Sequence, residues 1–200
     1  MYSNVTGFVL AGGKSSRMGA NKALLALNGT TLVEQAKAIV GQICERVFIL
    51  GSRQLYGVFG ECYEDVYANC GPLGGIHAAL LNSQTPYSLI IAVDTPFIRL
   101  EFLNYMIERA LNSSAVVTVP RIGGMVQPLC AVFSRNFLPI AEAALKFAQY
   151  KVEAAFPAER TLVLSEAELS SFEMAAEMFE NLNTPEDFER ARRRSSGQQP

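Results

Sequence analysis

Short apolar runs alternate with amphipathic stretches along almost the whole chain. The run at residues 87–93 (YSLIIAV) carries no charge, which is typical of a strand buried on both faces of a parallel sheet. The stretch at residues 31–44 instead spaces its apolar side chains three and four positions apart, as on one face of a helix. The alternation predicts an α/β fold, with helices covering both faces of a mostly parallel central sheet in three layers.

The same patterns assign one element to each segment. The expected strands are residues 5–10, 46–50, 62–66, 87–93, 115–120, 125–133 and 160–164. The expected helices are residues 31–44, 74–82, 101–111, 136–149 and 185–194. Pro128 lies inside one expected strand and indicates an edge position or a bulge there, because proline lacks the N–H that a sheet ladder needs.

The length of 200 residues suits one domain, which we expect to span residues 1–190. Half of the residues are hydrophobic and 18% are charged, as in an ordinary globular protein. The formal net charge of -2 argues against a nucleic-acid partner, since nucleic-acid-binding domains are usually basic. Residues 191–200 are charged and then polar, so we expect a flexible C-terminal tail.

The cysteines and the apolar runs predict a cytoplasmic protein without a membrane partner. No two of the four cysteines have C-x-x-C spacing, and the chain has a single histidine, so a structural zinc site is not expected. Four reduced, mostly buried thiols are the simpler expectation. The N-terminus lacks the basic start of a secretory signal, and no apolar run reaches the length of a membrane span.

A glycine-rich segment with cationic side chains follows the first expected strand. Gly12 and Gly13 allow close approach of the backbone to a phosphate, and Arg17 and Lys22 can neutralise its charge. Because this segment leaves the carboxyl end of a strand, it lies where α/β sheets bind ligands. The sequence therefore predicts a phosphate-binding segment.

Two common phosphate motifs do not explain this segment. A Walker loop needs a glycine five residues before the glycine of G-K-[ST], but Phe8 holds that position relative to Gly13. The dinucleotide fingerprint G-x-G-x-x-G is absent because Gly12 and Gly13 are adjacent. A dehydrogenase is thereby disfavoured.

Asp94 follows the apolar run at residues 87–93 and precedes Thr95 and Pro96. A carboxylate at this end of a strand, beside a phosphate segment, is well placed to bind Mg²⁺. Asp94 or Thr95 can also cap the following turn, and the two roles are compatible.

These segments together resemble a known family. The segments that carry the resemblance read LAGGKSSRMGANK (residues 10–22), CGPLGG (70–75), VDTPF (93–97), QPL (127–129) and NLNTPED (181–187). In this order they are similar to the motifs of the pyrophosphorylase-like nucleotidyltransferases, and within them to the molybdenum cofactor guanylyltransferases. The resemblance implies a Rossmann-like fold.

The resemblance also implies an activity and a site. The activity is transfer of GMP from GTP to the terminal phosphate of molybdopterin, with Mg²⁺ as cofactor and pyrophosphate as the second product. Delivery or cofactor-insertion proteins are implied as further partners. The implied nucleotide-binding residues are Leu10, Ala11, Gly12, Gly13, Lys22, Asp65 and Asp94. Arg17, Lys22 and Asp94 are the implied catalytic residues, with Asp94 on the metal, and Gln127, Asn181 and Asn183 are implied to bind the acceptor.

Several residues keep a structural interpretation beside the functional one. Asp65 can be a solvated loop carboxylate, and residues 71–75 can be a structural turn into a helix. His77 is expected to pack on that helix rather than to catalyse. Thr184 is expected to cap the last helix, next to Asn183.

Two positions depart from the family pattern, and other activities remain open. In the family an aspartate commonly precedes the loop lysine, but here this residue is Asn21, and an asparagine of the family is replaced by Leu50.

Cytidylyltransferases of the same cofactor resemble L-A-A-G, whereas residues 10–13 read L-A-G-G and favour GTP. A sugar-phosphate nucleotidyltransferase usually needs a longer chain. A non-catalytic nucleotide-binding protein need not retain both Lys22 and Asp94.

Overall fold

The computed structural model describes residues 1–12, 21–170, 172 and 175–195. Within them the main sheet has eight strands, with β8 paired to β7 and the others in the order β10-β7-β9-β6-β1-β4-β5. The strands are β1 (Val5–Leu10), β4 (Val47–Leu50), β5 (Cys62–Tyr63), β6 (Tyr87–Ala92), β7 (Val117–Ile122), β8 (Met125–Val126), β9 (Cys130–Ser134) and β10 (Thr161–Leu164). A small hairpin joins β2 (Ala26–Leu27) to β3 (Thr30–Thr31).

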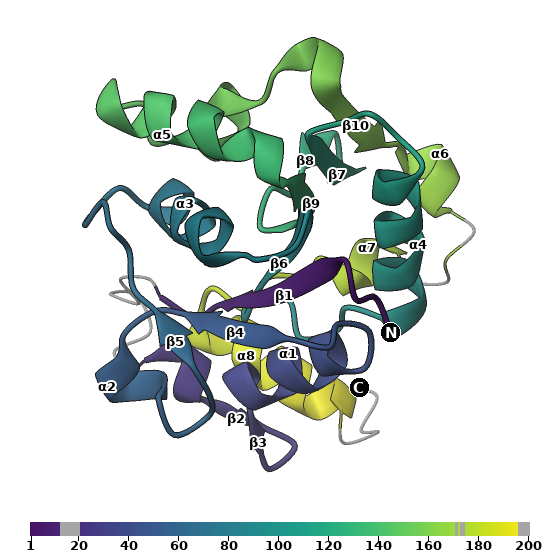
Figure 1. The fold of residues 1–200 in the computed structure, drawn as a ribbon. Helices are drawn as coiled ribbons and strands as arrows, with labels where there is room; N and C mark the ends of the chain where they lie inside the picture. Colours follow the sequence, from purple (N-terminus) through teal and green to yellow (C-terminus); the bar gives the residue numbers. More distant parts are fainter. Residues whose placement is uncertain (13–20, 171, 173–174, 196–200) are drawn as a thin grey trace.

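Helices cover both faces of this sheet (Figure 1). One face carries α1 (Leu32–Gly41), α4 (Leu100–Leu111), α6 (Glu166–Leu169), α7 (Ala175–Met178) and α8 (Pro185–Ser195). The other face carries α3 (Pro72–Asn82) and α5 (Leu138–Lys146). A short helix, α2 (Arg53–Tyr56), follows β4. The expected three-layer α/β/α fold is confirmed.

The strands contribute to two apolar clusters because successive side chains point to opposite faces. In β1, Val5 and Val9 join the cluster under α1 and α4, whereas Phe8 and Leu10 join the cluster under α3. All four side chains are buried. Burial on both faces explains why β1 and β6 are continuous apolar runs rather than alternating ones.

The carboxyl ends of most strands meet at one edge of the sheet. β1 pairs in parallel with β4 and β6, β4 pairs in parallel with β5, and β7 pairs in parallel with β10. β9 is antiparallel to both β6 and β7. The segments after β1, β4 and β6 therefore lie next to one another, which is the arrangement that a ligand site needs.

The region after β7 differs from expectation. Residues 125–133 are not one strand but β8 and β9, separated by a turn that contains Pro128. The expectation that Pro128 lies within an edge strand or bulge was wrong, because this turn removes the need for its missing N–H. β9 is a central strand between β6 and β7.

The C-terminal helix α8 ends at Ser195, one residue beyond the expected helix at residues 185–194, and so continues past residue 190, the expected end of the domain. Ala191 is buried, and Arg194 forms ion pairs with Glu177 and Glu180. The Arg194 guanidinium also lies 5.0 Å from the centre of the Phe97 ring, so the end of α8 packs on the turn after β6. In the described part of the chain, no helix has the length and apolarity needed to cross a bilayer.

Candidate active site

The backbone where β1 ends is held between its two neighbouring strands. The N–H groups of Ala11 and Gly12 both donate to the Leu50 carbonyl, each at 3.0 Å. The Leu10 carbonyl accepts from the Val93 N–H at 3.2 Å. The departure at Leu50 therefore concerns its side chain, which is buried, while its carbonyl fixes the start of the glycine-rich segment.

Lys22 connects three distant segments of the chain. It begins a short 3-10 turn, where the Asn21 side chain accepts from the Ala23 N–H at 3.2 Å and caps the turn. Lys22 Nζ lies 3.2 Å from Asp94 Oδ2 and 3.0 Å from Asn183 Oδ1. The predicted phosphate-binding, metal-binding and acceptor-binding segments thus meet at one ammonium group.

The Lys22–Asp94 ion pair is partly shielded from water. The two side chains are 13% and 26% exposed, respectively. Shielding from water strengthens the attraction between the two charges. It also strengthens the interaction of Lys22 with a bound phosphate and of Asp94 with a bound metal. An arrangement of this kind is typical of a site that stabilises phosphate charge.

Asp94 lies in the turn after β6 and does not cap α4. That helix begins at Leu100, and its N-cap residue is Arg99. Four residues separate Asp94 from this N-cap. Thr95 instead donates from Oγ1 to the Ala92 carbonyl at 3.3 Å within the turn. The Asp94 carboxylate is left to interact with Lys22.

The segment before α8 docks against the Asp94 turn. The Leu182 N–H donates to the Asp94 carbonyl at 3.0 Å, and the Leu182 side chain is buried. The N–H groups of Asn183 and Thr184 donate to Asp187 Oδ2, and Asp187 donates its own N–H to Thr184 Oγ1 at 3.1 Å. The predicted Thr184 cap is confirmed, and it fixes the backbone that presents Asn183.

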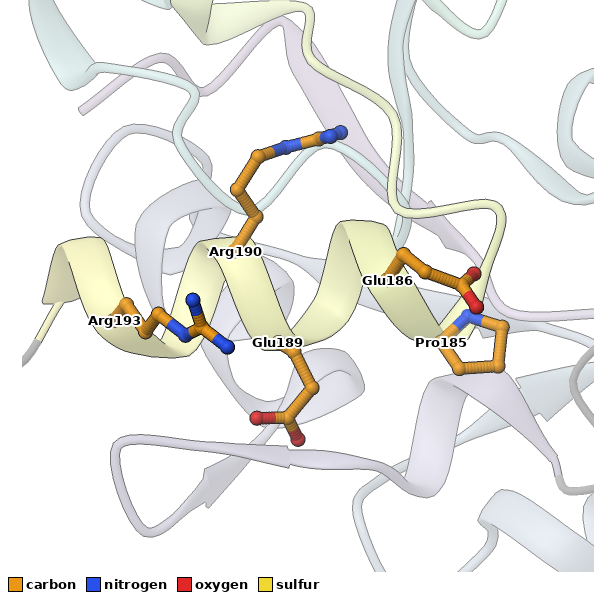
Figure 2. Close-up of a pocket in the computed structure, with 5 residues that line it drawn as sticks. All are labelled: Pro185, Glu186, Glu189, Arg190 and Arg193. Carbon is orange, nitrogen blue, oxygen red and sulfur yellow. The ribbon is translucent and has the colours of Figure 1, made fainter. Parts of the chain in front are cut away.

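A shallow depression on α8 lies just beyond this segment (Figure 2). It is lined by Pro185, Glu186, Glu189, Arg190 and Arg193. Glu189 and Arg190 extend from opposite sides of the helix in Figure 2. Carboxylates and guanidinium groups occur in equal number, so this surface lacks the single-sign field that attracts a polyanion. The Lys22 end of α8 is the better phosphate site.

An open cleft of about 730 Å³ lies beside Leu10 and Gly12. Its size is that of typical small-molecule pockets. Asp65 and Leu50 line it, together with Gly71 and Pro72 at the start of α3. Asp65 is exposed along one side, yet the protein around it removes enough water to raise the pKa of its carboxyl, with a further contribution from Glu64.

Two of the remaining predicted residues, Asn181 and Gln127, lie in segments that the structure describes. Asn181 is exposed, and the buried Leu182 separates it from Asn183, so both asparagines are on the solvent side of an extended segment. Gln127 lies between β8 and β9, where its N–H donates to the Pro120 carbonyl at 2.9 Å. Gly13 and Arg17 lie outside the described residues.

His77 and the cysteines have structural environments. His77 is 4% exposed, packs edge-on against Tyr67, and has its pKa lowered by burial. The expectation that it packs is confirmed. All four cysteines lie in described segments and are free thiols; Cys44, Cys70 and Cys130 are buried and Cys62 is half-buried.

Tyr56 is a residue of the site that the sequence patterns did not indicate. They assign no element between residues 50 and 62, yet Arg53–Tyr56 forms α2, and Tyr56 is buried at 3% exposure. Its hydroxyl lies 3.0 Å from the Ala11 carbonyl and 2.9 Å from Asn21 Nδ2. An aromatic residue inside a polar stretch beside a strand end was the available signal.

The oxygen atoms near Lys22 fit a Mg²⁺ ion. Asp94 supplies one carboxylate, and Asn183 supplies an amide oxygen within reach of the same ammonium group. Mg²⁺ prefers one or two carboxylates and completes its coordination with phosphate oxygens and water. The donor set therefore suits a metal shared between protein and nucleotide.

The fold and this arrangement of residues define a nucleotidyltransferase. A family model for the MobA-like NTP transferase domain matches residues 7–159, and the chain belongs to that family. Enzymes of this family generally depend on a divalent metal.

Individual relatives agree with this assignment. A probable molybdenum cofactor guanylyltransferase of Pelotomaculum thermopropionicum is 36% identical over 189 residues, covering 94% of this chain and 91% of the relative. A molybdenum cofactor guanylyltransferase of Desulfosudis oleivorans is 33% identical over 190 residues, covering 94% of each chain. The resemblance in the sequence motifs is confirmed.

A solved structure shows the same fold. The molybdopterin-guanine dinucleotide biosynthesis protein A of Archaeoglobus fulgidus superposes with a TM-score of 0.84 at 22% identity, covering 96% of this chain and 99% of that one. The 2-C-methyl-D-erythritol 4-phosphate cytidylyltransferase of Thermus thermophilus superposes with a TM-score of 0.65 at 17% identity, covering 94% and 98%.

Proposed function

We propose that the protein transfers GMP from GTP to the terminal phosphate of molybdopterin, forming molybdopterin guanine dinucleotide and pyrophosphate. The observation that carries this proposal is the contact of Lys22 with both Asp94 and Asn183. One cationic group thereby links the end of the glycine-rich segment, the turn after β6 and the segment before α8. The names of the relatives support the choice of substrates.

The reaction is an in-line displacement at the α-phosphorus of GTP. An oxygen of the molybdopterin phosphate forms the new P–O bond, and the bond from the α-phosphorus to the bridging oxygen of the β-phosphate breaks. Pyrophosphate leaves with that electron pair. The nucleophile is already anionic at neutral pH, so the mechanism needs no general base, and catalysis rests on positioning and electrostatics.

Lys22 and Asp94 have different electrostatic roles in the proposed reaction. Lys22 donates to phosphate oxygens and stabilises the charge that develops as pyrophosphate leaves. Asp94 would hold Mg²⁺, which would supply positive charge that neutralises the phosphates. Arg17 and the backbone of Gly13 are proposed to add phosphate contacts. In this account Lys22 exchanges its contact with Asp94 for the phosphates as the nucleotide binds.

The base is proposed to bind in the cleft beside Leu10 and Gly12. The backbone of Leu10, Ala11 and Gly12 would contact the base and ribose. Asp65 can accept hydrogen bonds from the N1–H and amino group of guanine, which cytosine does not present in the same pattern. This pairing favours GTP over CTP.

The acceptor is proposed to bind on the side of Asn183. Amide groups offer both donors and acceptors, which suits the polar edge of a pterin. Asn181 and Gln127 are proposed to extend this surface. A labile product also makes contact with a delivery or cofactor-insertion protein a reasonable proposal.

Calorimetric titration tests the nucleotide part of the proposal. The protein is titrated with GTP, CTP, ATP and UTP in the presence of Mg²⁺. Tight binding of GTP alone is expected. Preference for CTP would show instead a cytidylyltransferase with the same mechanism. If no triphosphate bound, the phosphate-binding role of the glycine-rich segment would be contradicted.

A further inference from the structure

The Tyr56 hydroxyl contacts a residue near each end of the glycine-rich segment, Ala11 and Asn21. Its oxygen lies 3.0 Å from the Ala11 carbonyl oxygen, 2.9 Å from Asn21 Nδ2 and 3.0 Å from Asn21 Oδ1. A phenol has one proton to donate, and a carbonyl oxygen can only accept. The consistent arrangement is that Asn21 Nδ2 donates to Tyr56, and Tyr56 donates to Ala11.

The orientation of the Asn21 amide supports this direction. Its Oδ1 accepts from the Ala23 N–H at 3.2 Å, so the oxygen faces the 3-10 turn. The Nδ2 group is then the part of the amide that serves Tyr56 as a donor. The chain of hydrogen bonds runs from Asn21 through Tyr56 to Ala11.

We propose that Tyr56 is a positioning residue that ties Ala11 to Asn21 and so holds the two ends of the phosphate-binding segment ready for a nucleoside triphosphate. The inference rests on the proposed function, because it assigns the segment to phosphate binding. Tyr56 acts through Ala11 and Asn21, and Asn21 directly precedes Lys22. Ends that are fixed before binding reduce the conformational entropy that binding must remove.

The hydrogen bonds of the peptide unit between Ala11 and Gly12 show how Tyr56 holds the start of the segment. The N–H of this peptide unit, from Gly12, donates to the Leu50 carbonyl at 3.0 Å, and its carbonyl, from Ala11, accepts from Tyr56. Both polar ends of this peptide are therefore fixed. Without the phenol hydroxyl, the carbonyl end loses its donor and the peptide can rotate where the segment leaves β1.

The Tyr56 ring packs against Gly51, where a side chain would collide with it. A Cβ atom on Gly51 would lie 2.8 Å from Cε2 of the Tyr56 ring, closer than packed atoms come. Gly51 also has φ +149°, a conformation that favours glycine. Burial raises the pKa of Tyr56, against a smaller lowering by Asn21, so the hydroxyl keeps its proton at neutral pH.

The same geometry gives a reason for asparagine at position 21. An aspartate there has no N–H to donate and would accept the Tyr56 proton itself, in a stronger, charge-assisted bond. The Ala11 carbonyl would then lose its donor. Because asparagine donates to the Tyr56 oxygen, the Tyr56 proton stays available for the Ala11 carbonyl.

The test uses Tyr56→Phe, with Tyr63→Phe as the matched control. The Tyr63 hydroxyl donates to Glu61 Oε1 at 3.1 Å, and among the described residues it forms no hydrogen bond to the glycine-rich segment. Hydrogen exchange in the absence of nucleotide is measured for the amides of residues 10–12 and 22–25, and the Kd of the Mg-triphosphates is measured by calorimetry. For Tyr56→Phe we expect about tenfold faster exchange and about tenfold weaker binding, as the loss of one or two hydrogen bonds implies.

Asn21→Asp adds a second, independent readout. Its negative charge weakens triphosphate binding in any background, so its effect is compared in the wild type and in Tyr56→Phe. We expect a clearly smaller effect in Tyr56→Phe, because the hydroxyl that aspartate would capture is already absent.

Three results would overturn the inference. They are exchange rates in Tyr56→Phe that match those of Tyr63→Phe, faster exchange without weaker binding, and an equal effect of Asn21→Asp in both backgrounds. If the wild-type protein binds no triphosphate, the proposed function fails, but the exchange measurement still tests whether Tyr56 holds the segment.

Discussion

Lys22 Nζ and Asp94 Oδ2 lie 3.2 Å apart, although the two residues are separated by 72 positions in the chain. The contact exists because β1 and β6 are neighbouring parallel strands whose carboxyl ends meet at one edge. The phosphates of a bound triphosphate would accept hydrogen bonds from Lys22, and Asp94 would be a ligand of Mg²⁺. The ion pair thus holds together the two groups that the proposed reaction needs.

Asp94→Asn removes the charge of this carboxylate while keeping its shape. Turnover is expected to fall at least ~100-fold, because a neutral amide is a poor ligand for Mg²⁺ and electrostatic stabilisation is lost. Pyrophosphate release under saturating substrates measures the effect. Glu45→Gln, which neutralises an exposed carboxylate just before β4, serves as the control and should retain normal turnover. Near-normal turnover of Asp94→Asn would remove Asp94 from the metal site.

Lys22→Ala is expected to weaken triphosphate binding by about 1.5–3 kcal/mol, the usual loss for a hydrogen bond to a charged group. GMP, which lacks the β- and γ-phosphates, should lose much less affinity. Calorimetry with GTP and GMP compares the two. Lys146→Ala is the control, since Lys146 is exposed and forms an ion pair with Glu142 of its own helix at 2.7 Å. Equal losses for GTP and GMP would contradict a role on the outer phosphates.

The strands and the long helices could be predicted from the sequence. Strands buried on both faces are continuous apolar runs, and long helices space their apolar residues three and four positions apart. The run at residues 87–93 and the strand β6 differ by one residue. Short helices such as α2 escaped prediction because four residues are too few to show a helical period. The division of residues 125–133 into two strands also escaped, since the turn between them carries no glycine.

The candidate site was predictable in part. Lys22 and Asp94 could be named because each stands beside a recognisable strand end. The contact of Lys22 with Asn183 depends on how residues 181–184 dock against the turn after β6, through the Leu182 N–H and the Asp94 carbonyl. Such long-range docking leaves no periodic signal. The same limit explains why the role of Tyr56 became visible only in the structure.

The affinity for GTP should depend on pH through Asp65. Burial and Glu64 raise the pKa of this carboxyl, so it takes up a proton at a higher pH than an ordinary aspartate does. The protonated form is a poorer acceptor for guanine. The KM for GTP is therefore expected to rise as the pH falls towards the raised pKa, beginning above pH ~4, where a free aspartate titrates.

Asp65→Asn provides the control for this pH dependence. The amide does not titrate, so its KM should be higher than that of the wild type at neutral pH but flat down to acidic pH. Persistence of the wild-type rise in KM in Asp65→Asn would assign the titration to another group.

Gly74→Ala tests how α3 holds Asp65. A Cβ atom at this position would lie 3.1 Å from Asp65 Oδ2 and 3.0 Å from the Tyr67 carbonyl oxygen. Alanine favours a helix by up to about 1 kcal/mol over glycine, so the helix itself should not be weakened. We expect Asp65 to be displaced and the KM for GTP to rise about fivefold to tenfold, the effect of losing one hydrogen bond.

Gly41→Ala is the matched control for this substitution. Gly41 ends α1, and a Cβ atom there meets no atom within 4 Å. Its KM should equal that of the wild type. A Gly74→Ala protein with unchanged KM and unchanged thermal stability would show that Asp65 does not contact the base.

Product formation tests the central claim most directly. The purified protein is incubated with molybdopterin, Mg²⁺ and each of the four nucleoside triphosphates in turn, and the products are identified by mass and by pyrophosphate release. We expect molybdopterin guanine dinucleotide and one pyrophosphate per dinucleotide with GTP, and loss of both products in Asp94→Asn. Formation of the cytosine dinucleotide with CTP instead, or binding of GTP without any dinucleotide, would contradict it.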